Sequence, residues 1–194
     1  MKDTLYRWDT DLLIWINSFG TESTDAFWLI VTSVWTWFPL FFFIVYLFLR
    51  NLNRTNALLA TFFFGATGVA TLAVKYLTKF YFKRLRPCNV EELAASLRVL
   101  LCKDSFSFFS GHASFSFAII TFTVLALQKE LKWIYILYLW PVLFALSRMI
   151  TGVHYPSDII VGTGVGIVIG VVTHSIYQKG WIKLPKIIQE KLHL

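Results

Sequence analysis

Charge is scarce in this chain: 15% of its 194 residues are Asp, Glu, Lys or Arg, whereas soluble domains carry roughly a quarter. Hydrophobic residues make up 57% of the sequence, and the mean hydropathy is +0.63. Several apolar runs approach the roughly 20 residues that a helix needs to cross a bilayer. These features exclude an ordinary soluble domain and indicate an integral membrane protein.

Metal-ligand patterns, repeats and linkers are missing as well. The chain has two cysteines, and its Cys and His residues are not grouped at the spacing of a metal site, so we expect neither a metal nor another cofactor. No internal repeat, low-complexity tract or interdomain linker is visible. We therefore expect one membrane-embedded domain that covers residues 1–194.

Long alternating strands are also missing, which argues against a barrel. Because every backbone polar group inside a bilayer must be satisfied internally, the apolar runs predict an all-α polytopic bundle of about five transmembrane helices. The predicted spans are residues 26–49, 55–78, 112–128, 131–150 and 158–177. Residues 5–19 are too short and too charged to cross. Their apolar positions at helical spacing predict an amphipathic helix that lies at the membrane interface or packs on the bundle.

Five spans put the two termini on opposite faces of the membrane. Lys and Arg are nearly balanced between the faces, so a bare count does not decide the orientation. Several of those on the face of the 79–111 loop fall in clusters that look functional. When these are discounted, the 50–54 and 128–132 turns and the tail from Gln178 are predicted on the cytoplasmic side of the membrane. The 79–111 loop then faces outward, to the periplasm or its equivalent.

Both cysteines, Cys88 and Cys102, fall in this outward loop. In an oxidising compartment, a bridge between them would close a loop of about 15 residues and add on the order of 3 kcal/mol by restricting the unfolded chain. We expect this disulfide, and the alternative is a pair of reduced thiols without a structural role.

Three polar clusters interrupt the apolar pattern, all on the predicted outward face. The segment "KFYFKRLRP" (79–87) ends the second span, "SGH" (110–112) opens the third, and "SRMITGVHYPSD" (147–158) joins the fourth to the fifth. In a helical bundle the three clusters can converge beside the membrane surface. Ionisable residues at such positions are candidates for function.

The clusters together predict a phosphate-binding site. Lys79, Arg86 and Arg148 supply positive charge without a matching group of carboxylates, and the planar guanidinium matches the geometry of a phosphate. Ser110 and Gly111 precede a helix, so their backbone N–H groups can point at an anion.

Two histidines and one carboxylate can turn this phosphate site into an enzyme. His154 and Asp158 are four residues apart, so the carboxylate can accept a hydrogen bond from one imidazole nitrogen and leave the other free to attack. His112 would then be the general acid that protonates the departing alkoxide. This arrangement fits phosphoryl transfer through a phosphohistidine.

Each of these residues also has a simpler structural alternative. His112 alone at the start of a helix would more often be structural, and Arg148 could form a buried ion pair with Asp158. Basic residues at the end of a span can be interfacial anchors whose charged ends reach toward the headgroups. This alternative applies to Lys75, Lys79, Lys83 and Arg84. Lys75, one helical turn before Lys79, could instead extend the phosphate site.

The fifth span carries a glycine pattern that is separate from these clusters. Its "GTGVG" run resembles a nucleotide loop, but no strand precedes it. Gly162, Gly166 and Gly170 recur at four-residue spacing, which favours close helix packing. His174 and His193 fall on the cytoplasmic side, and we expect no role for them in the site.

The motifs are similar to those of the type 2 phosphatidic acid phosphatase superfamily. That family's pattern is Lys-x6-Arg-Pro, then Ser-Gly-His, then Ser-Arg-x5-His-x3-Asp, and this chain matches every charged and histidine position between residues 79 and 158. One departure is Phe109, which stands where the family usually has proline before Ser-Gly-His. This change bears on the geometry of the loop more than on the chemistry.

The resemblance implies a metal-independent phosphatase that acts on membrane lipid phosphates. It assigns His154 as nucleophile, Asp158 as its orienting partner and His112 as general acid. It assigns phosphate binding to Lys79, Arg86, Ser110, Gly111 and Arg148. Vanadium-dependent haloperoxidases share such an anion site, but they are soluble, and five spans argue against them.

Within the lipid phosphatases, the small size and the outward site rank undecaprenyl diphosphate first as substrate, ahead of lipid A phosphates and phosphatidylglycerophosphate. The non-enzymatic alternative is an anion-binding transporter, for which internal repeats and polar residues at mid-membrane would be expected. The expected partners are a lipid phosphate and the bilayer. The net charge of +7 indicates anionic headgroups rather than nucleic acid.

Overall fold

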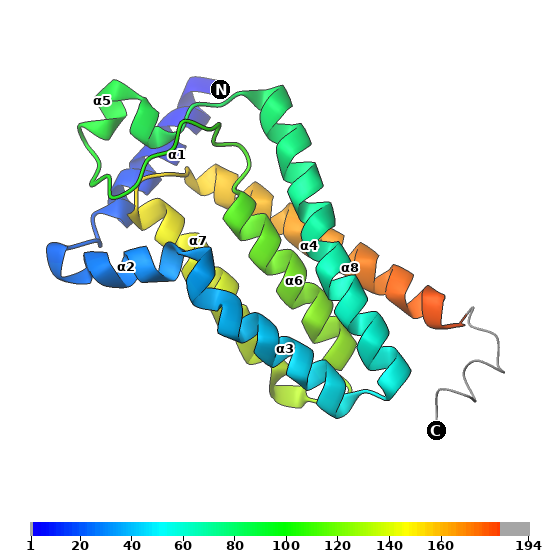
Figure 1. Cartoon of the computed structure of the whole chain (residues 1–194). Helices are drawn as coiled ribbons and strands as arrows, with labels where there is room; N and C mark the ends of the chain where they lie inside the picture. The colour runs from blue at the N-terminus through cyan, green and yellow to red at the C-terminus, as the bar shows by residue number, and fades with distance from the viewer. Residues whose placement is uncertain (1, 183–194) are drawn as a thin grey trace.

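The computed structural model describes residues 2–182, and every regular element in that range is a helix (Figure 1). The longer helices are α1 (Lys2–Asn17), α2 (Asp25–Thr32), α3 (Phe38–Asn51), α4 (Arg54–Phe82), α6 (Gly111–Leu127), α7 (Leu139–Ile150) and α8 (Pro156–Ile182). The short ones are η1 (Glu22–Thr24), η2 (Val34–Trp37), η3 (Pro87–Asn89), α5 (Glu91–Ala94) and η4 (Lys132–Tyr138). The all-α prediction is confirmed. The tail after residue 182, with His193 and its lysines, lies outside the described residues.

Four segments of the described chain are long and apolar enough to cross a membrane. They are Val34–Asn51, Arg54–Asn89, Lys132–Ile150 and Pro156–Lys179. Helix α6 is apolar but shorter, and it lies in the middle of the bundle in contact with α3, α4, α7 and α8. Its side chains are buried on all sides, among them Ala113, Ile120 and Phe122. The Ser-Gly-His motif therefore sits at the end of the central helix.

The first predicted span, residues 26–49, is wrong as a single helix. Helix α2 ends at Thr32, Ser33 is extended, and Figure 1 shows α2 lying across the end of the bundle rather than in line with α3. The physical reason is Pro39 in the first turn of α3, which cannot donate a backbone hydrogen bond and would clash with the carbonyl one turn earlier in a continuous helix. The Trp37 indole donates to the Val31 carbonyl (2.8 Å), so the end of α2 remains hydrogen-bonded.

Helices α6 and α8 pack closely because glycines of α8 face the backbone of α6. A Cβ atom on Gly162 would lie 2.7 Å from the Ser110 carbonyl oxygen, and one on Gly166 would lie 2.4 Å from that of Ser114. A side chain cannot fit at such distances. The packing interpretation of the four-residue glycine spacing is confirmed, and the contact holds the start of α6 against the start of α8.

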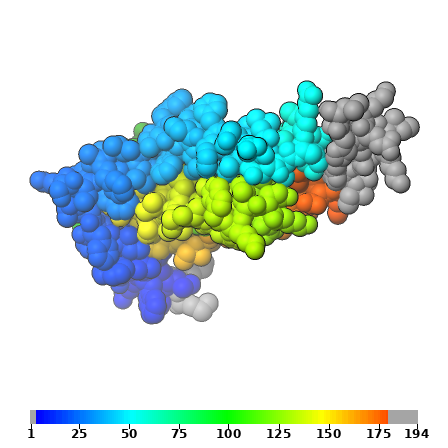
Figure 2. Space-filling model, turned by 90° about the horizontal axis from the view of Figure 1, so that it is seen from below, coloured from blue at the N-terminus to red at the C-terminus, as the bar shows by residue number. Residues whose placement is uncertain are grey.

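Aromatic side chains join α3 to α7. The ring centroids of Phe41 and Trp140 are 5.5 Å apart, and those of Trp37 and Trp140 are 5.6 Å apart. Figure 2 shows the face of the molecule on which α3 lies alongside the η4–α7 segment, with α1 at one end. This face closes the bundle next to the region where the polar clusters meet.

Helix α1 packs at the end of the bundle that holds these clusters (Figure 1). Leu13 is fully buried, and the Asn17 amide donates to the Met149 and Ile150 carbonyls at 3.2 and 2.8 Å. On its other side α1 exposes several large apolar residues: Leu5, Trp8, Leu12 and Trp15. The helix therefore packs on the bundle and also presents an apolar face.

Candidate active site

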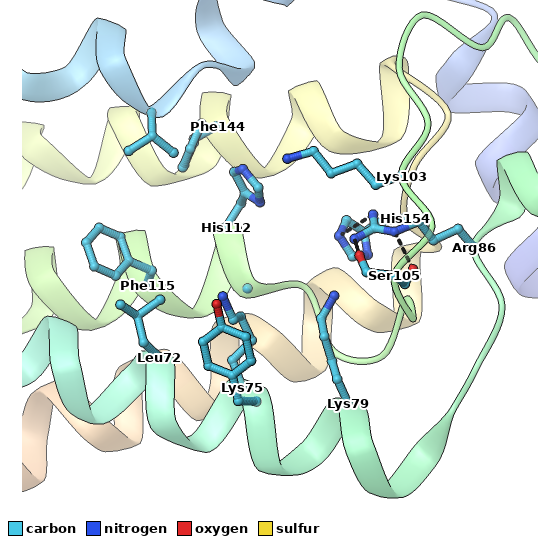
Figure 3. Close-up of a pocket in the computed structure, with 13 residues that line it drawn as sticks. Leu72, Lys75, Lys79, Arg86, Lys103, Ser105, His112, Phe115, Phe144 and His154 are labelled. Atoms are coloured by element: carbon cyan, nitrogen blue, oxygen red, sulfur yellow. Dashed lines mark hydrogen bonds between the residues drawn. The ribbon is translucent and has the colours of Figure 1, made fainter.

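The three polar clusters meet around one pocket of about 410 Å³, formed where α4, the loop before α6, and the starts of α6 and α8 come together (Figure 3). Its basic and histidine lining residues are Lys75, Lys79, Arg86, Lys103, His112 and His154. The other side of the pocket is apolar, with Leu72, Phe115 and Phe144. Basic donors on one side and apolar groups on the other suit a lipid with an anionic headgroup.

His154 lies immediately before α8 and is 1% exposed. Its Nδ1 is 3.4 Å from Asp158 Oδ2 and 3.2 Å from Ser107 Oγ. The Ser107 hydroxyl in turn donates to Asp158 Oδ2. With Nδ1 protonated, the imidazole donates to this pair, and its Nε2 lone pair accepts from Arg86 Nη1 at 3.2 Å. Nε2 is thus the nitrogen whose lone pair faces the Arg86 guanidinium, a predicted phosphate-binding group.

The surroundings of His154 favour its neutral form. Burial, and next the positive charge of Arg86, lower the pKa of His154 well below its ordinary value of 6.5. A neutral imidazole has the lone pair that a nucleophile needs. The environment therefore supplies the protonation state that attack on phosphorus requires.

Asp158, in the first turn of α8, is fully buried and held at both oxygens. Oδ1 accepts from Arg84 Nη1 at 3.0 Å, while Oδ2 accepts from the Tyr155 backbone N–H at 3.0 Å as well as from Ser107. Its backbone carbonyl accepts from the Ser110 N–H at 3.0 Å. Two clusters distant in sequence are joined through this residue. The ion-pair alternative between Arg148 and Asp158 is not what the structure shows, since the partner of Asp158 is Arg84.

The predicted phosphate-binding residues are placed in two ways. Lys79, Arg86 and Gly111 line the pocket. Arg86 Nε donates to the Ser105 carbonyl at 2.7 Å, and Lys79 donates to the Phe106 carbonyl. The second set lies just behind the lining and is buried: Ser110 and Arg148.

These two buried residues have different tasks. Ser110 caps α6, since its hydroxyl oxygen accepts from the Ala113 N–H at 3.4 Å. Arg148 donates to the Thr32 hydroxyl, and its Nε has no hydrogen-bond partner among residues 2–182. An unpaired buried donor is costly, so Arg148 retains donor capacity beside the pocket.

Gly111 explains the position of Lys75. A Cβ on Gly111 would lie 2.4 Å from Lys75 Cδ, so the missing side chain leaves room for the lysine stem. Lys75 consequently lines the pocket (Figure 3) instead of extending outward as an interfacial anchor.

His112 lies in the first turn of α6 and lines the same pocket as His154. Its ring packs against Phe144, with centroids 5.0 Å apart. Figure 3 shows the two histidines on different sides of the pocket, with Lys75 and Lys79 approaching from α4. A phosphate held between them would have a nucleophile on one side and an acid on the other.

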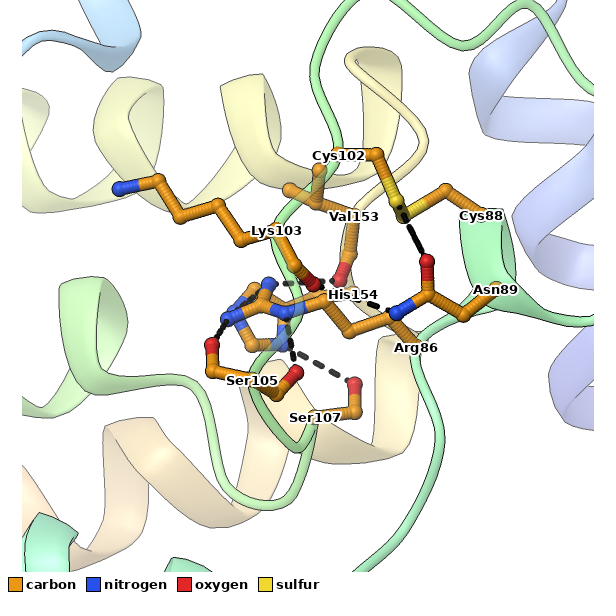
Figure 4. Close-up of a disulfide and its surroundings, with 9 residues drawn as sticks. All are labelled: Arg86, Cys88, Asn89, Cys102, Lys103, Ser105, Ser107, Val153 and His154. Carbon is orange, nitrogen blue, oxygen red and sulfur yellow. Dashed lines mark hydrogen bonds between the residues drawn. A yellow bond between two sulfur atoms is a disulfide. The ribbon is translucent and has the colours of Figure 1, made fainter.

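A disulfide between Cys88 and Cys102, with Cα atoms 5.9 Å apart, closes the loop beside the site (Figure 4). Arg86 precedes the bridge, and Lys103, Ser105 and Ser107 follow it. The bridge thus keeps two stretches of the site next to each other. Phe109, the position where the family usually has proline, is buried at the end of this loop.

Several residues at the site were missed from the sequence. Ser105 and Ser107 alternate with phenylalanine just before Ser-Gly-His, and this alternation is a signal of polar groups directed to one side. Lys103 had no such signal. Arg84 was interpreted as an anchor, and Asp9 of α1, which binds it, could not be linked to it by any local pattern.

The polar groups around the pocket are mainly donors, which suit an anion. Within the described residues, no group of three or more His, Cys, Asp or Glu side chains is placed to hold a metal ion. The chemistry that the arrangement itself offers is nucleophilic attack by an imidazole on an anion held by lysine and arginine.

The chain is similar to known membrane phosphatases. The sequence model of the PAP2 superfamily matches residues 59–182. A lipid A 4′-phosphatase of Bacteroides thetaiotaomicron is 30% identical over 164 residues, which are 81% of this chain and 72% of that protein. A lipid A 4′-phosphatase of Porphyromonas gingivalis is 25% identical over 178 residues, 87% of this chain and 72% of that protein.

Two solved structures are also similar. Aquifex aeolicus LpxE superposes with a TM-score of 0.62 at 26% identity, covering 84% of this chain and 92% of that one. A PAP2 type phosphatidylglycerolphosphate phosphatase of Bacillus subtilis superposes with a TM-score of 0.69, covering 91% of this chain and 87% of that one. Its 20% identity shows a shared fold alone.

Proposed function

Because the chain belongs to the PAP2 superfamily and is a membrane lipid phosphatase, we propose that it hydrolyses a phosphate monoester of lipid A through a phosphohistidine at His154. The ranking from the sequence placed undecaprenyl diphosphate first. The lipid A 4′-phosphatases among its relatives favour the alternative instead. Membership of a phosphatase family also sets the transporter alternative aside.

The observation that carries the mechanism is the orientation of the His154 ring. Nδ1 faces Asp158 and Ser107, while Nε2 faces Arg86 and the pocket. A phosphate bound by Lys79 and Arg86 would place its phosphorus near Nε2. Holding the ring in one tautomer and one orientation reduces the cost of reaching the transition state.

The proposed reaction has two steps. In the first, His154 Nε2 forms a bond to phosphorus as the bond to the lipid oxygen breaks, and His112 gives its proton to that oxygen. In the second, His112 accepts a proton from water as the water oxygen attacks phosphorus, which breaks the N–P bond. Inorganic phosphate leaves, and both histidines return to their starting states.

The disulfide supports an outward-facing site in the inner membrane. Disulfides persist in oxidising compartments such as the periplasm, and Cys88 and Cys102 lie beside the pocket. We infer that the pocket opens on the periplasmic side, where the substrate headgroup is exposed.

The test is phosphate release from a panel of lipids in detergent, with a chelator present. The panel contains lipid A, undecaprenyl diphosphate, phosphatidylglycerophosphate and phosphatidic acid. We expect release from lipid A that the chelator does not affect, that His154→Ala abolishes and that the distant control His174→Ala retains.

A phosphate-labelled substrate, quenched during turnover, should leave acid-labile, alkali-stable label on the protein, and none on His154→Ala. Substantial turnover by folded His154→Ala would reject the nucleophile. Release from another member of the panel in preference to lipid A would reject the substrate.

A further inference from the structure

The pocket lies on one side of the His154 ring, and Asp158 lies on the other. Behind its partner Asp158 lies a second polar group, which reaches the N-terminal helix α1. Helix α1 precedes residues 59–182, the part that matches the family. A contact from α1 to the catalytic carboxylate would therefore be a feature that the family pattern does not describe.

Asp9 makes this contact indirectly, through Arg84 and Ser157. Its Oδ2 accepts from Arg84 Nη2 at 2.7 Å and from the Ser157 hydroxyl at 2.5 Å, and its Oδ1 accepts from the Ser157 backbone N–H at 2.8 Å. The Asp9 side chain is 10% exposed. Both of its oxygens are therefore used, one by Arg84 and both by the first turn of α8.

Arg84 lies between two carboxylates. Nη2 donates to Asp9, while Nη1 donates to Asp158 Oδ1 at 3.0 Å and to Ser157 Oγ at 2.8 Å. The guanidinium stacks 3.8 Å from the ring centroid of Tyr155. A planar group with fixed donors can hold two acceptors in one plane, so the direction of one carboxylate is linked to the other.

We propose that Asp9 is a positioning residue for the phosphoryl transfer: it fixes Arg84, and Arg84 fixes the plane of the Asp158 carboxylate that orients His154. This inference rests on the proposed function, because it concerns the same reaction at the same nucleophile.

The partial exposure of the Arg84 side chain explains why Asp9 is required to hold it in place. The Arg84 side chain is 27% exposed, whereas Asp158 is fully buried. Without Asp9, Arg84 gains rotamers directed to water, which favours its release by side-chain entropy. A buried carboxylate that loses its cation is destabilised in the charged form, and its oxygens lose the hydrogen bond that keeps Oδ2 toward His154 Nδ1.

A purely structural alternative is that Asp9 only attaches α1 to the bundle. Helix α1 has separate attachments farther along: Leu13 is fully buried, and Asn17 accepts from the Arg98 backbone N–H at 2.7 Å as well as donating to carbonyls of α7. Removing one charge at Asp9 leaves these attachments intact. Attachment and positioning can therefore be separated by experiment.

The first arm compares Asp9→Asn, Asp9→Glu and the control Asp11→Asn, which removes an exposed carboxylate from the same helix. In the full-length protein with a lipid phosphate that it hydrolyses, we expect Asp9→Asn to lower kcat about 10-fold, as for the loss of one charge-assisted hydrogen bond. KM should change less than about 2-fold on the same reasoning, since Asp9 does not reach the pocket. Asp9→Glu should recover part of kcat, and Asp11→Asn should retain all of it.

The second arm tests the link between Asp9 and Arg84. Arg84→Lys keeps the charge but cannot hold two carboxylates in one plane. If the two residues act as one unit, the double variant Asp9→Asn/Arg84→Lys should lose no more kcat than the worse single variant. Multiplicative losses would reject the unit.

The third arm does not require turnover. Nitrogen NMR of histidine-labelled protein, assigned with His154→Gln, reports which ring nitrogen of His154 carries the proton. We expect the Nδ1–H tautomer in the unsubstituted protein and in Asp11→Asn, and a mixture in Asp9→Asn.

The outcomes separate the two hypotheses. A failure of the proposed function would appear as no phosphate release while the tautomer still depends on Asp9. An unchanged tautomer in Asp9→Asn, or a loss confined to KM and melting temperature, would overturn the positioning role.

Discussion

The two sides of His154 are built differently. Behind the ring, which we call the matched side, carboxylates are paired with a cation: Asp158 and Asp9 share Arg84 at 3.0 and 2.7 Å. In front, the basic groups of the pocket have only neutral acceptors among residues 2–182, such as the Ser105 carbonyl for Arg86 and the Phe106 carbonyl for Lys79. The matched side holds the His154 ring in place, and the donors of the other, unmatched side are left for an anion.

Repulsion among the pocket cations favours the binding of an anion. Burial, and next the positive charges of Arg148 and Arg86, lower the pKa of Lys103. Like charges held close together destabilise one another. A bound phosphate would reduce this repulsion, and the reduction would contribute to its binding free energy.

The largest effect is expected when the matched side is broken. Asp158→Asn removes the charge that Nδ1 of His154 faces and permits the wrong tautomer. We expect kcat to fall about 10³- to 10⁴-fold, as when the orienting carboxylate of a catalytic triad is lost. Initial rates measure this, with Glu130→Gln, an exposed change at the other end of the bundle, as control. Near-normal kcat in Asp158→Asn would contradict the role of the matched side in orienting His154.

A substitution on the unmatched side should have a smaller effect, and it should be seen in kcat/KM. Lys75→Gln removes one of several cations, so we expect kcat/KM to fall about 3- to 10-fold, the value of one hydrogen bond to a charged group that others partly replace. Added salt should reduce the rate of the unsubstituted enzyme more than that of the variant. Lys83→Gln, an exposed lysine of the same segment, is the matched control. Equal losses in the two variants would exclude a specific role for Lys75.

The pKa of His154 tests the comparison further, because the positive charges of the pocket disfavour protonation of its ring. Its pKa is lowered by burial and then by Arg86, so the ring stays neutral as the pH falls through 6.5 and gains its proton only at a lower pH. An NMR titration of His154, assigned with His154→Gln, should give a midpoint below 6.5. A midpoint at 6.5 or above would show that Asp158 outweighs the pocket cations.

The smallest effect on activity is expected from the disulfide. Cys88→Ser with Cys102→Ser leaves every group on both sides of His154 in place and loosens only the loop that joins them. We expect a loss of stability on the order of 3 kcal/mol, seen as a lower melting temperature, with kcat/KM reduced about 3-fold or less. Alkylation of protein taken from its membrane should find no free thiol. Two alkylatable thiols would contradict the bridge.

The residues in front of His154 could be predicted from the sequence better than those behind it. Lys79 and Arg86 are recognisable because their spacing and the nearby proline occur within one short segment. Arg84 lies in that segment too, but its role depends on Asp9, 75 positions away, and local spacing does not contain such a contact. Lys75 required knowledge that the absent Cβ of Gly111 leaves room for its stem.

The fold shows the same division. Apolar runs predicted the helices, because the period and length of a helix are local properties. The break at Ser33 was missed because the run from Ala26 to Phe48 carries no charged residue. Pro39 was a signal of the break, but membrane helices can accommodate a proline. Its presence therefore did not show that the run forms two helices.

The apolar side of the pocket determines which substrate concentration controls the rate of this enzyme. Leu72, on α4, and Val34 are 40% and 42% exposed and line the pocket. Figure 3 shows Leu72 and Phe115 on the side away from His154. A headgroup can enter past them while its acyl chains remain among other lipids. Turnover then follows the mole fraction of substrate in the surface, not its amount per litre. Diluting the substrate with inert phospholipid at constant bulk concentration will slow the enzyme.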